Sequence, residues 1–224
     1  MEPIKCFFLV PSDKERVSLR RYSSSDAKCP ANQSYHNAEF FIGDGPLQSA
    51  IGMYAEQPPR NDARWPRKCQ SCDYEFSLED QFQIFRRTLY YRADTGALLT
   101  LNEAPAGAMW FADWMGERWR GPDGHCLAVR VPRNHDWLVD GYASNCDSPC
   151  ANCGRPRHSC PNISAQGERD CPGYIDARPH KCWVRHGVPP EITADKNGIT
   201  CGAGAGSIQT AEWHGYLRGG YLVL

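Results

Sequence analysis

Apolar residues along this chain occur mostly in short runs bounded by turn residues, a pattern typical of β-strands. The run Ile4–Val10 predicts a first strand, and residues 38–42 predict another that ends at a Gly-Asp-Gly-Pro turn. Hairpins are predicted where two such runs flank a turn: 88–92 with 97–101, 126–131 with 137–139, and 192–194 with 199–200. Residues 213–224, interrupted by two glycines, predict the closing strands.

Helical spacing is scarce, and one segment carries it best. Leu78, Phe82 and Phe85 are spaced to share one face of a helix, and Ser77-Leu78-Glu79-Asp80 before them resembles a capping box. The pattern predicts one principal helix over residues 78–88, and the aromatic-rich segment 106–115 predicts a second, short helix. The expected fold class is therefore a β-rich α+β fold of irregular antiparallel hairpins with one principal helix, stabilised by metal clusters.

The stretch 147–179 differs from the rest of the chain. It is rich in Cys, Pro, Arg and Gly and nearly devoid of large aliphatic residues, so it cannot build an apolar core of its own. We expect an inserted Cys-rich, metal-nucleated lobe at 147–179, with residues 1–146 and 180–224 forming the main β-rich body.

Composition indicates which partners and which cellular compartment to expect. The chain has 224 residues, 12 of them cysteine, and a formal net charge of -1. That charge gives no general reason to expect nucleic acid or an anionic membrane as partner. No apolar run reaches the ~20 residues needed to span a bilayer, and no basic leader precedes the first apolar run. We expect a reducing, cytoplasmic site of synthesis, which favours bound metal over disulfides.

Thiolate and imidazole ligands in clusters are typical of tetrahedral zinc sites. The first candidate site combines a C-x6-H pair with a C-x2-C pair, whose sulfurs can face one point across a tight turn: Cys29, His36, Cys69 and Cys72. The alternative is that the C-x2-C pair uses other ligands and that His36 is an ordinary turn residue.

Two further candidate zinc sites involve the cysteines around the expected lobe. The second candidate set is Cys150, Cys153, Cys160 and Cys171, with His158 competing for one place and a pair of disulfides as the alternative. The third set is Cys146, Cys182, His186 and Cys201, with His214 as a substitute and ordinary buried thiols as the alternative. Cys6 and Cys126 lie in apolar runs and are expected to be buried and inert.

No coherent catalytic set emerges. A zinc deaminase requires H-x-E before its P-C-x2-C motif, and here only Pro149-Cys150-Ala151-Asn152-Cys153 is present. A metallohydrolase needs a cluster with an open coordination position. Nucleic-acid binding is a further alternative, because basic residues outnumber acidic ones six to three in the stretch 151–189, which also holds Tyr174 and Trp183.

Four segments taken together resemble an uncharacterised family of cysteine-containing proteins encoded by bacteriophages and bacterial genomes: Trp119–Gly124, Ala143–Cys146, Cys182–Gly187 and Cys201–Ile208. The resemblance implies a phage-encoded protein, with a virion component as one role, and carries no activity. The favoured interpretation is a non-enzymatic, zinc-stabilised structural or interaction protein whose partners are other protein subunits. A zinc-dependent nucleic-acid-binding protein is the alternative, and a metallohydrolase is the weaker one.

Overall fold

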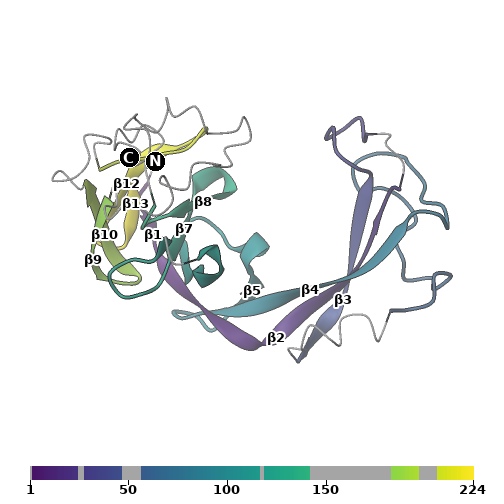
Figure 1. Ribbon diagram of the computed structural model, residues 1–224, viewed down its shortest axis with the longest axis horizontal. Coiled ribbons are helices and arrows are strands. Elements are labelled where there is room, and N and C mark those ends of the chain that lie inside the picture. Colours follow the sequence, from purple (N-terminus) through teal and green to yellow (C-terminus); the bar gives the residue numbers. More distant parts are fainter. Residues whose placement is uncertain (1, 25–27, 47–56, 117–118, 142–182, 197–205) are drawn as a thin grey trace, which may run out of the picture. The chain divides into compact units, whose positions relative to one another are not determined.

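The structure is a computed structural model that describes residues 2–24, 28–46, 57–116, 119–141, 183–196 and 206–224. Strands dominate these residues (Figure 1), and no helix among them reaches seven residues. None of their helices is long and apolar enough to cross a membrane. The described residues divide into two compact units: those within 2–9, 92–95 and 104–224 form one, and those within 10–91 and 96–103 form the other. We call them unit 1 and unit 2.

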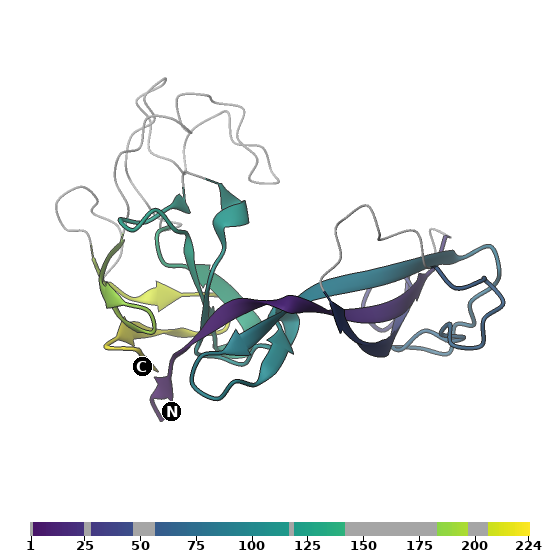
Figure 2. The ribbon, with the colours of Figure 1, turned by 90° about the horizontal axis from the view of Figure 1, so that it is seen from below.

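Unit 2 is built on long antiparallel strands. Its strands β2 (Phe7–Tyr22), β3 (Asn37–Pro46), β4 (Gln81–Arg92) and β5 (Leu98–Thr100) lie side by side in the order β5-β4-β2-β3, and η2 (Leu101–Glu103) follows β5. Strands β2 and β4 run along each other in both views (Figures 1 and 2), and each also contributes residues to unit 1. The described parts of the β2–β3 and β3–β4 connections lie in unit 2. They carry the first predicted ligand set, Cys29, His36, Cys69 and Cys72.

The core of unit 2 is small. Leu19 and Ile84 face the same side of the sheet and pack against Trp65, with Val17 and Phe82 partly buried beside them. The indole N–H of Trp65 donates to the carbonyl of Pro59 (3.0 Å), which closes a turn within the long β3–β4 connection. This cluster is small, and a further crosslink would add to the stability of unit 2.

Unit 1 holds the larger core. It contains β1 (Ile4–Lys5), the start of β2, β6 (Ala108–Phe111), β7 (Leu127–Val131), β8 (His135–Leu138), β9 (Trp183–Val188), β10 (Glu191–Lys196), β11 (Ile208–Gln209), β12 (His214–Arg218) and β13 (Tyr221–Val223), with short 3-10 turns η3 (Asp113–Met115) and η5 (Pro132–Asn134). Strands β1, β13, β12 and β11 form one antiparallel sheet, and β9 and β10 form a hairpin. β6 pairs parallel with β2 and antiparallel with β7, which pairs with β8. Met109, Leu127, Val129 and Leu217 are fully buried between these layers.

The predicted principal helix over 78–88 is wrong, because residues 81–92 form strand β4. Phe82 and Ile84 face the small core, whereas Phe85 lies on the opposite face, so apolar residues on both faces imitated a helical spacing. Leu78 is exposed. The capping-box contact does exist, since the N–H of Ser77 donates to Asp80 (2.7 Å), but it closes a turn before the strand.

The predicted short helix over 106–115 is wrong as well. Residues 108–111 form β6, and only the three-residue turn η3 is helical. Ala108, Met109 and Trp110 are all buried, because this strand lies between two neighbours and is covered on both faces. Gly107 has φ +93°, and a Cβ there would lie 2.7 Å from the carbonyl oxygen of Lys5, so this close approach of two backbones requires glycine.

Two of the three predicted hairpins are confirmed. The 88–92/97–101 and 126–131/137–139 hairpins are confirmed as β4–β5 and β7–β8, and the closing strands are β12 and β13. Residues 192–194 lie in β10, whose partner is β9, while the expected return strand at 199–200 lies outside the described residues. The proposed lobe at 147–179 also falls outside them.

Candidate metal centre

Unit 2 brings together the first predicted ligand set. The Sγ atoms of Cys29, Cys69 and Cys72 and a ring nitrogen of His36 all lie within 4.8 Å of one another. Zn–S bonds of about 2.3 Å place the sulfurs of a tetrahedral site roughly 3.8 Å apart, so the observed spread suits one ion. Cys29, His36 and Cys69 are buried and Cys72 is partly buried. The four side chains can therefore hold a metal ion.

Two tight turns supply these ligands. The first lies in the β2–β3 connection, where Lys28 and Tyr35 form an isolated bridge and the N–H of Cys29 donates to the carbonyl of Ser34 (2.6 Å). Gln33 lies in the left-handed region at φ 57° and donates its N–H back to the carbonyl of Cys29 (2.8 Å). His36 follows at once, so the fold places one sulfur and one imidazole at the same end of this hairpin.

The second turn is the C-x2-C segment of the β3–β4 connection. Lys68 and Glu75 bridge its ends, and the N–H of Cys69 donates to the carbonyl of Tyr74 (2.8 Å). The N–H of Ser71 points to the Sγ of Cys69 (3.5 Å). This donor acts to stabilise a thiolate, the form that ligates metal.

A backbone contact joins the two turns. The N–H of Gln70 donates to the carbonyl of Asn37 (3.0 Å), the first residue of β3. Across the junction, the Nδ1 of His36 lies 3.2 Å from the Sγ of Cys72. The imidazole therefore presents Nδ1 to the three sulfurs.

Electrostatics favour a cation in this cluster. Burial acts to raise the pKa of Cys69, but donors from Ser71, Asn37 and His36 outweigh it and lower the pKa to about 6. At Cys72, a backbone N–H from Tyr74 acts to lower the pKa, while burial and the neighbouring Cys29 and Cys69 raise it. Adjacent sulfurs cannot all ionise without a compensating positive charge, which a bound metal ion supplies.

A second layer of side chains supports the ligands. The ring of Tyr74 stacks on His36, and its hydroxyl lies 3.2 Å from Oδ2 of the buried Asp80. Asp80 also accepts from the N–H groups of Ser24 (3.1 Å) and Ser77 (2.7 Å). The carboxylate thus links the start of the first turn to the end of the second. The sequence analysis missed Tyr74 and Asp80, and only the position of Tyr74 two residues after Cys72 could have indicated a role.

The other predicted ligands divide into two groups. His186 is described and exposed, and its Nε2 lies 3.3 Å from Oδ2 of Asp195. The remaining members lie outside the described residues: Cys146, Cys150, Cys153, Cys160, Cys171, Cys182 and Cys201. Their predicted zinc sites stay predictions. Cys6 and Cys126 are buried as expected, and burial raises the pKa of Cys6 to about 12.

No family model matches this chain, and comparisons with curated proteins and with solved structures also gave no match. The site is therefore interpreted from its own chemistry. Three thiols and one imidazole fill all four positions of a tetrahedral shell. This set therefore leaves no open coordination position for water, which catalytic zinc requires. The arrangement suits a structural ion.

The basic stretch 151–189 is described only over residues 183–189. Trp183 is buried, and so is Arg185, whose Nε lies 3.0 Å from Oδ1 of the buried Asp140. Arg185 also pairs with Asp123. These two residues, counted in the expected basic and aromatic surface, are therefore internal to unit 1.

Proposed function

We propose that this chain is a zinc-stabilised structural or interaction protein in which one zinc ion joins the two turns of unit 2. The observation that carries the proposal is the convergence of Cys29, His36, Cys69 and Cys72 within 4.8 Å. Zinc is the ion of choice because tetrahedral sites rich in thiolate select zinc or iron, and imidazole as the fourth ligand is common in structural zinc sites.

The fold of unit 2 supports a structural role. Its apolar cluster of Leu19, Trp65, Ile84 and their partly buried neighbours is small, although Leu89 is buried as well. A structural zinc ion supplies apparent binding energy of about 10–16 kcal/mol in small modules. Burial of a large apolar side chain contributes about 1.5–3 kcal/mol, so the ion would add at least as much as Leu19, Trp65 and Ile84 together. The ion would join the C-x2-C turn of the β3–β4 connection to the β2–β3 turn, in addition to the bonds from Arg21 to the carbonyls of Pro66 and Ser77.

The role in a phage particle rests on the sequence resemblance alone. Partnership with other protein subunits and nucleic-acid binding through residues 151–189 likewise stay predictions. The burial of Trp183 and Arg185 removes two residues from the nucleic-acid surface and leaves structural zinc as the better supported function.

Metal analysis of the purified full chain tests the proposal. We expect the double variant Cys69→Ser/Cys72→Ser to hold one zinc ion fewer per chain than the wild type, as measured by inductively coupled plasma mass spectrometry. Cys126→Ala, which removes a buried thiol outside the cluster, is the matched control and should keep the wild-type zinc content. Equal zinc in the double variant and the wild type, or iron in place of zinc, would overturn the assignment.

A further inference from the structure

The sheet of unit 2 has two unlike faces. Leu19 and Ile84 lie on the face that Trp65 covers. Side chains alternate along a strand, so Ser18, Arg20 and Tyr22 of β2 lie on the opposite face. That second face carries polar and aromatic side chains, and two hollows open on it.

The two hollows follow the same pair of strands. The larger, of about 450 Å³, is lined by Arg16, Glu39, Phe41, Arg87, Asn102 and Glu103, among others. The smaller, of about 200 Å³, is lined by Arg20, Tyr22, Ser34, Tyr35, Asn37 and Gln83. In the β2–β3 register, Ser18 lies opposite Phe41, Arg20 opposite Glu39, and Tyr22 opposite Asn37. Four residues of extended strand span about 13 Å, so the two hollows lie next to each other on this face, and we call the pair the groove.

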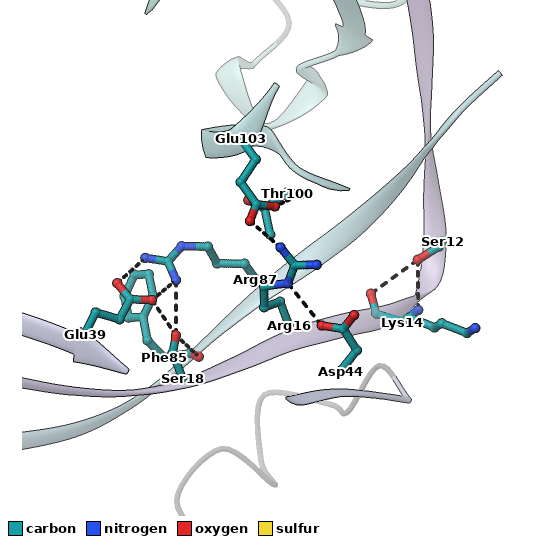
Figure 3. Close-up of polar contacts among 10 residues, drawn as sticks. All are labelled: Ser12, Lys14, Arg16, Ser18, Glu39, Asp44, Phe85, Arg87, Thr100 and Glu103. Atoms are coloured by element: carbon teal, nitrogen blue, oxygen red, sulfur yellow. Dashed lines mark hydrogen bonds and ion pairs between the residues drawn. The ribbon is translucent and has the colours of Figure 1, made fainter. Parts of the chain in front are cut away.

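The charged groups of this groove are held in place by one another. The Nη2 of Arg87 lies 2.8 Å from Oε2 of Glu39, and its Nη1 donates to Ser18 (3.3 Å). Figure 3 shows Arg16 between the carboxylates of Asp44 (3.1 Å) and Glu103. Arginine hydrogen bonds hold the pKa of Glu39 below its usual value. A ligand therefore meets planar donors and acceptors that are already ordered, which lowers the entropic cost of binding.

Flat aromatic rings border these polar groups. Phe41 is 51% exposed and Tyr35 is 60% exposed. The guanidinium of Arg20 lies over two rings, 5.7 Å from the centroid of Tyr22 and 5.6 Å from that of Phe85. These groups complement the surface of a pyranose. Its C–H face can stack on an exposed ring, and its hydroxyls can hydrogen-bond the ordered guanidinium, carboxylate and amide groups beside that ring.

We propose that this face of unit 2 binds a neutral oligosaccharide along the groove from Tyr35 to Phe41. Its charges decide against nucleic acid, which also stacks on aromatic rings. Three guanidinium groups, of Arg16, Arg20 and Arg87, are balanced by three carboxylates, of Glu39, Asp44 and Glu103. A phosphate backbone needs a positive groove, whereas sugar hydroxyls use both donors and acceptors.

The groove is a separate site from the metal centre, and the two adjoin at one end. Tyr35 precedes His36, and the carbonyl of Ser34 accepts the N–H of Cys29, so that end rests on the proposed zinc site. The Phe41 end is independent of it. Zinc content measured in the same preparations separates the two proposals, because glycan binding without zinc would contradict the metal assignment alone.

The test is a screen of the labelled, full-length protein on an array of neutral and acidic oligosaccharides, with a single-stranded oligothymidine as a further probe. We expect binding to neutral glycans that changes little from low to high salt. No binding to any neutral glycan, or salt-sensitive binding to the acidic glycans and oligothymidine alone, would overturn the proposal; the latter result would point to nucleic acid.

Two adjacent phenylalanines provide a matched pair of variants. Phe40 and Phe41 are both 51% exposed, and they lie on opposite faces of β3. Titration calorimetry with the best neutral glycan should show that Phe41→Ala weakens binding roughly tenfold or more, as truncation of an aromatic contact residue does. Phe40→Ala should bind like the wild type, and both variants should keep their zinc. Equal loss in the two variants would show that the groove is not the binding face.

Discussion

The imidazole ring of His36 lies parallel to the phenol ring of Tyr74, with 4.0 Å between the ring centroids and 10° between the planes. Tyr74 in turn hydrogen-bonds Asp80, so the histidine is oriented by a chain of contacts that ends at a buried carboxylate. Supporting contacts of this kind fix the ring orientation of a ligand and raise metal affinity.

Tyr74→Ala should therefore lower the affinity of the cluster for zinc by about tenfold or more, the usual loss when a supporting contact of a metal ligand is removed. Tyr74→Phe keeps the stacked ring and should lose less. The measurement is competition with a chromophoric chelator, following the ion that is absent from the Cys69→Ser/Cys72→Ser variant. Tyr221→Ala, an exposed tyrosine of unit 1, is the control. Unchanged affinity in Tyr74→Ala would show that the stacking does not support the ligand.

Asp80 should make unit 2 sensitive to acid. Burial acts to raise the pKa of Asp80, but N–H donors from Ser24 and Ser77 and the hydroxyl of Tyr74 outweigh it and lower the pKa. The folded state thus favours the carboxylate, and its contribution to stability is complete above the unfolded pKa of about 3.9 and is lost as pH falls through the lower folded pKa.

Denaturant unfolding of Asp80→Asn at several pH values checks this expectation. The variant should be less stable than the wild type at neutral pH, and the difference should shrink below about pH 4. Glu79→Gln, an exposed change in the same turn, should show no such convergence. A difference that stays constant down to the lowest pH would contradict the role of the charge.

Removal of zinc should affect the two units unequally. Under the proposed assignment, the zinc ion stabilises unit 2 beside a small apolar cluster, whereas unit 1 has its own larger core around Met109, Leu127 and Leu217. After treatment with a chelator, hydrogen exchange should accelerate in β3 and the start of β4, while β7 and β12 stay protected. Re-addition of zinc should restore protection. Uniform loss of protection, or none, would contradict this prediction.

Arg185→Ala should destabilise unit 1. The side chains of Arg185 and Asp140 are each 4% exposed, and Arg185 also bonds Asp123 and the carbonyl of His125 (3.2 Å). Removing one member of a buried pair leaves an uncompensated charge and costs about 3–5 kcal/mol. Urea unfolding measures the loss, and Arg218→Ala, at an exposed position of β12, should change the free energy of unfolding little.

The metal centre could be predicted from sequence because its chemistry is local in part. A C-x2-C pair brings its two sulfurs together across one turn, and the C-x6-H pair does the same across another, as the contacts of Cys29 and Cys69 show. The spacing does not tell which turns meet. That follows from the pairing of β2 with β3 and from the bond between Gln70 and Asn37, which are tertiary contacts.

The helix predictions failed for a related reason. Strand β4 carries Phe82 and Ile84 on one face and Phe85 on the other, so its apolar positions do not alternate and the period of two is hidden. The supporting residues were hidden in another way. Asp80 looked like part of a helix start, and only the fold brings Ser24 within 3.1 Å of it.

The order in which the site is assembled follows from the positions of its two turns. Cys29 and His36 lie in the connection of the β2–β3 hairpin, whose two strands pair with each other within residues 7–46. A growing chain can form that half of the site early, with two of the four ligands in place. The centre can close only after Cys72 has been synthesised, and β4 follows directly behind it. Binding of the ion would therefore precede or accompany the pairing of β4, the last long strand of unit 2, with β2.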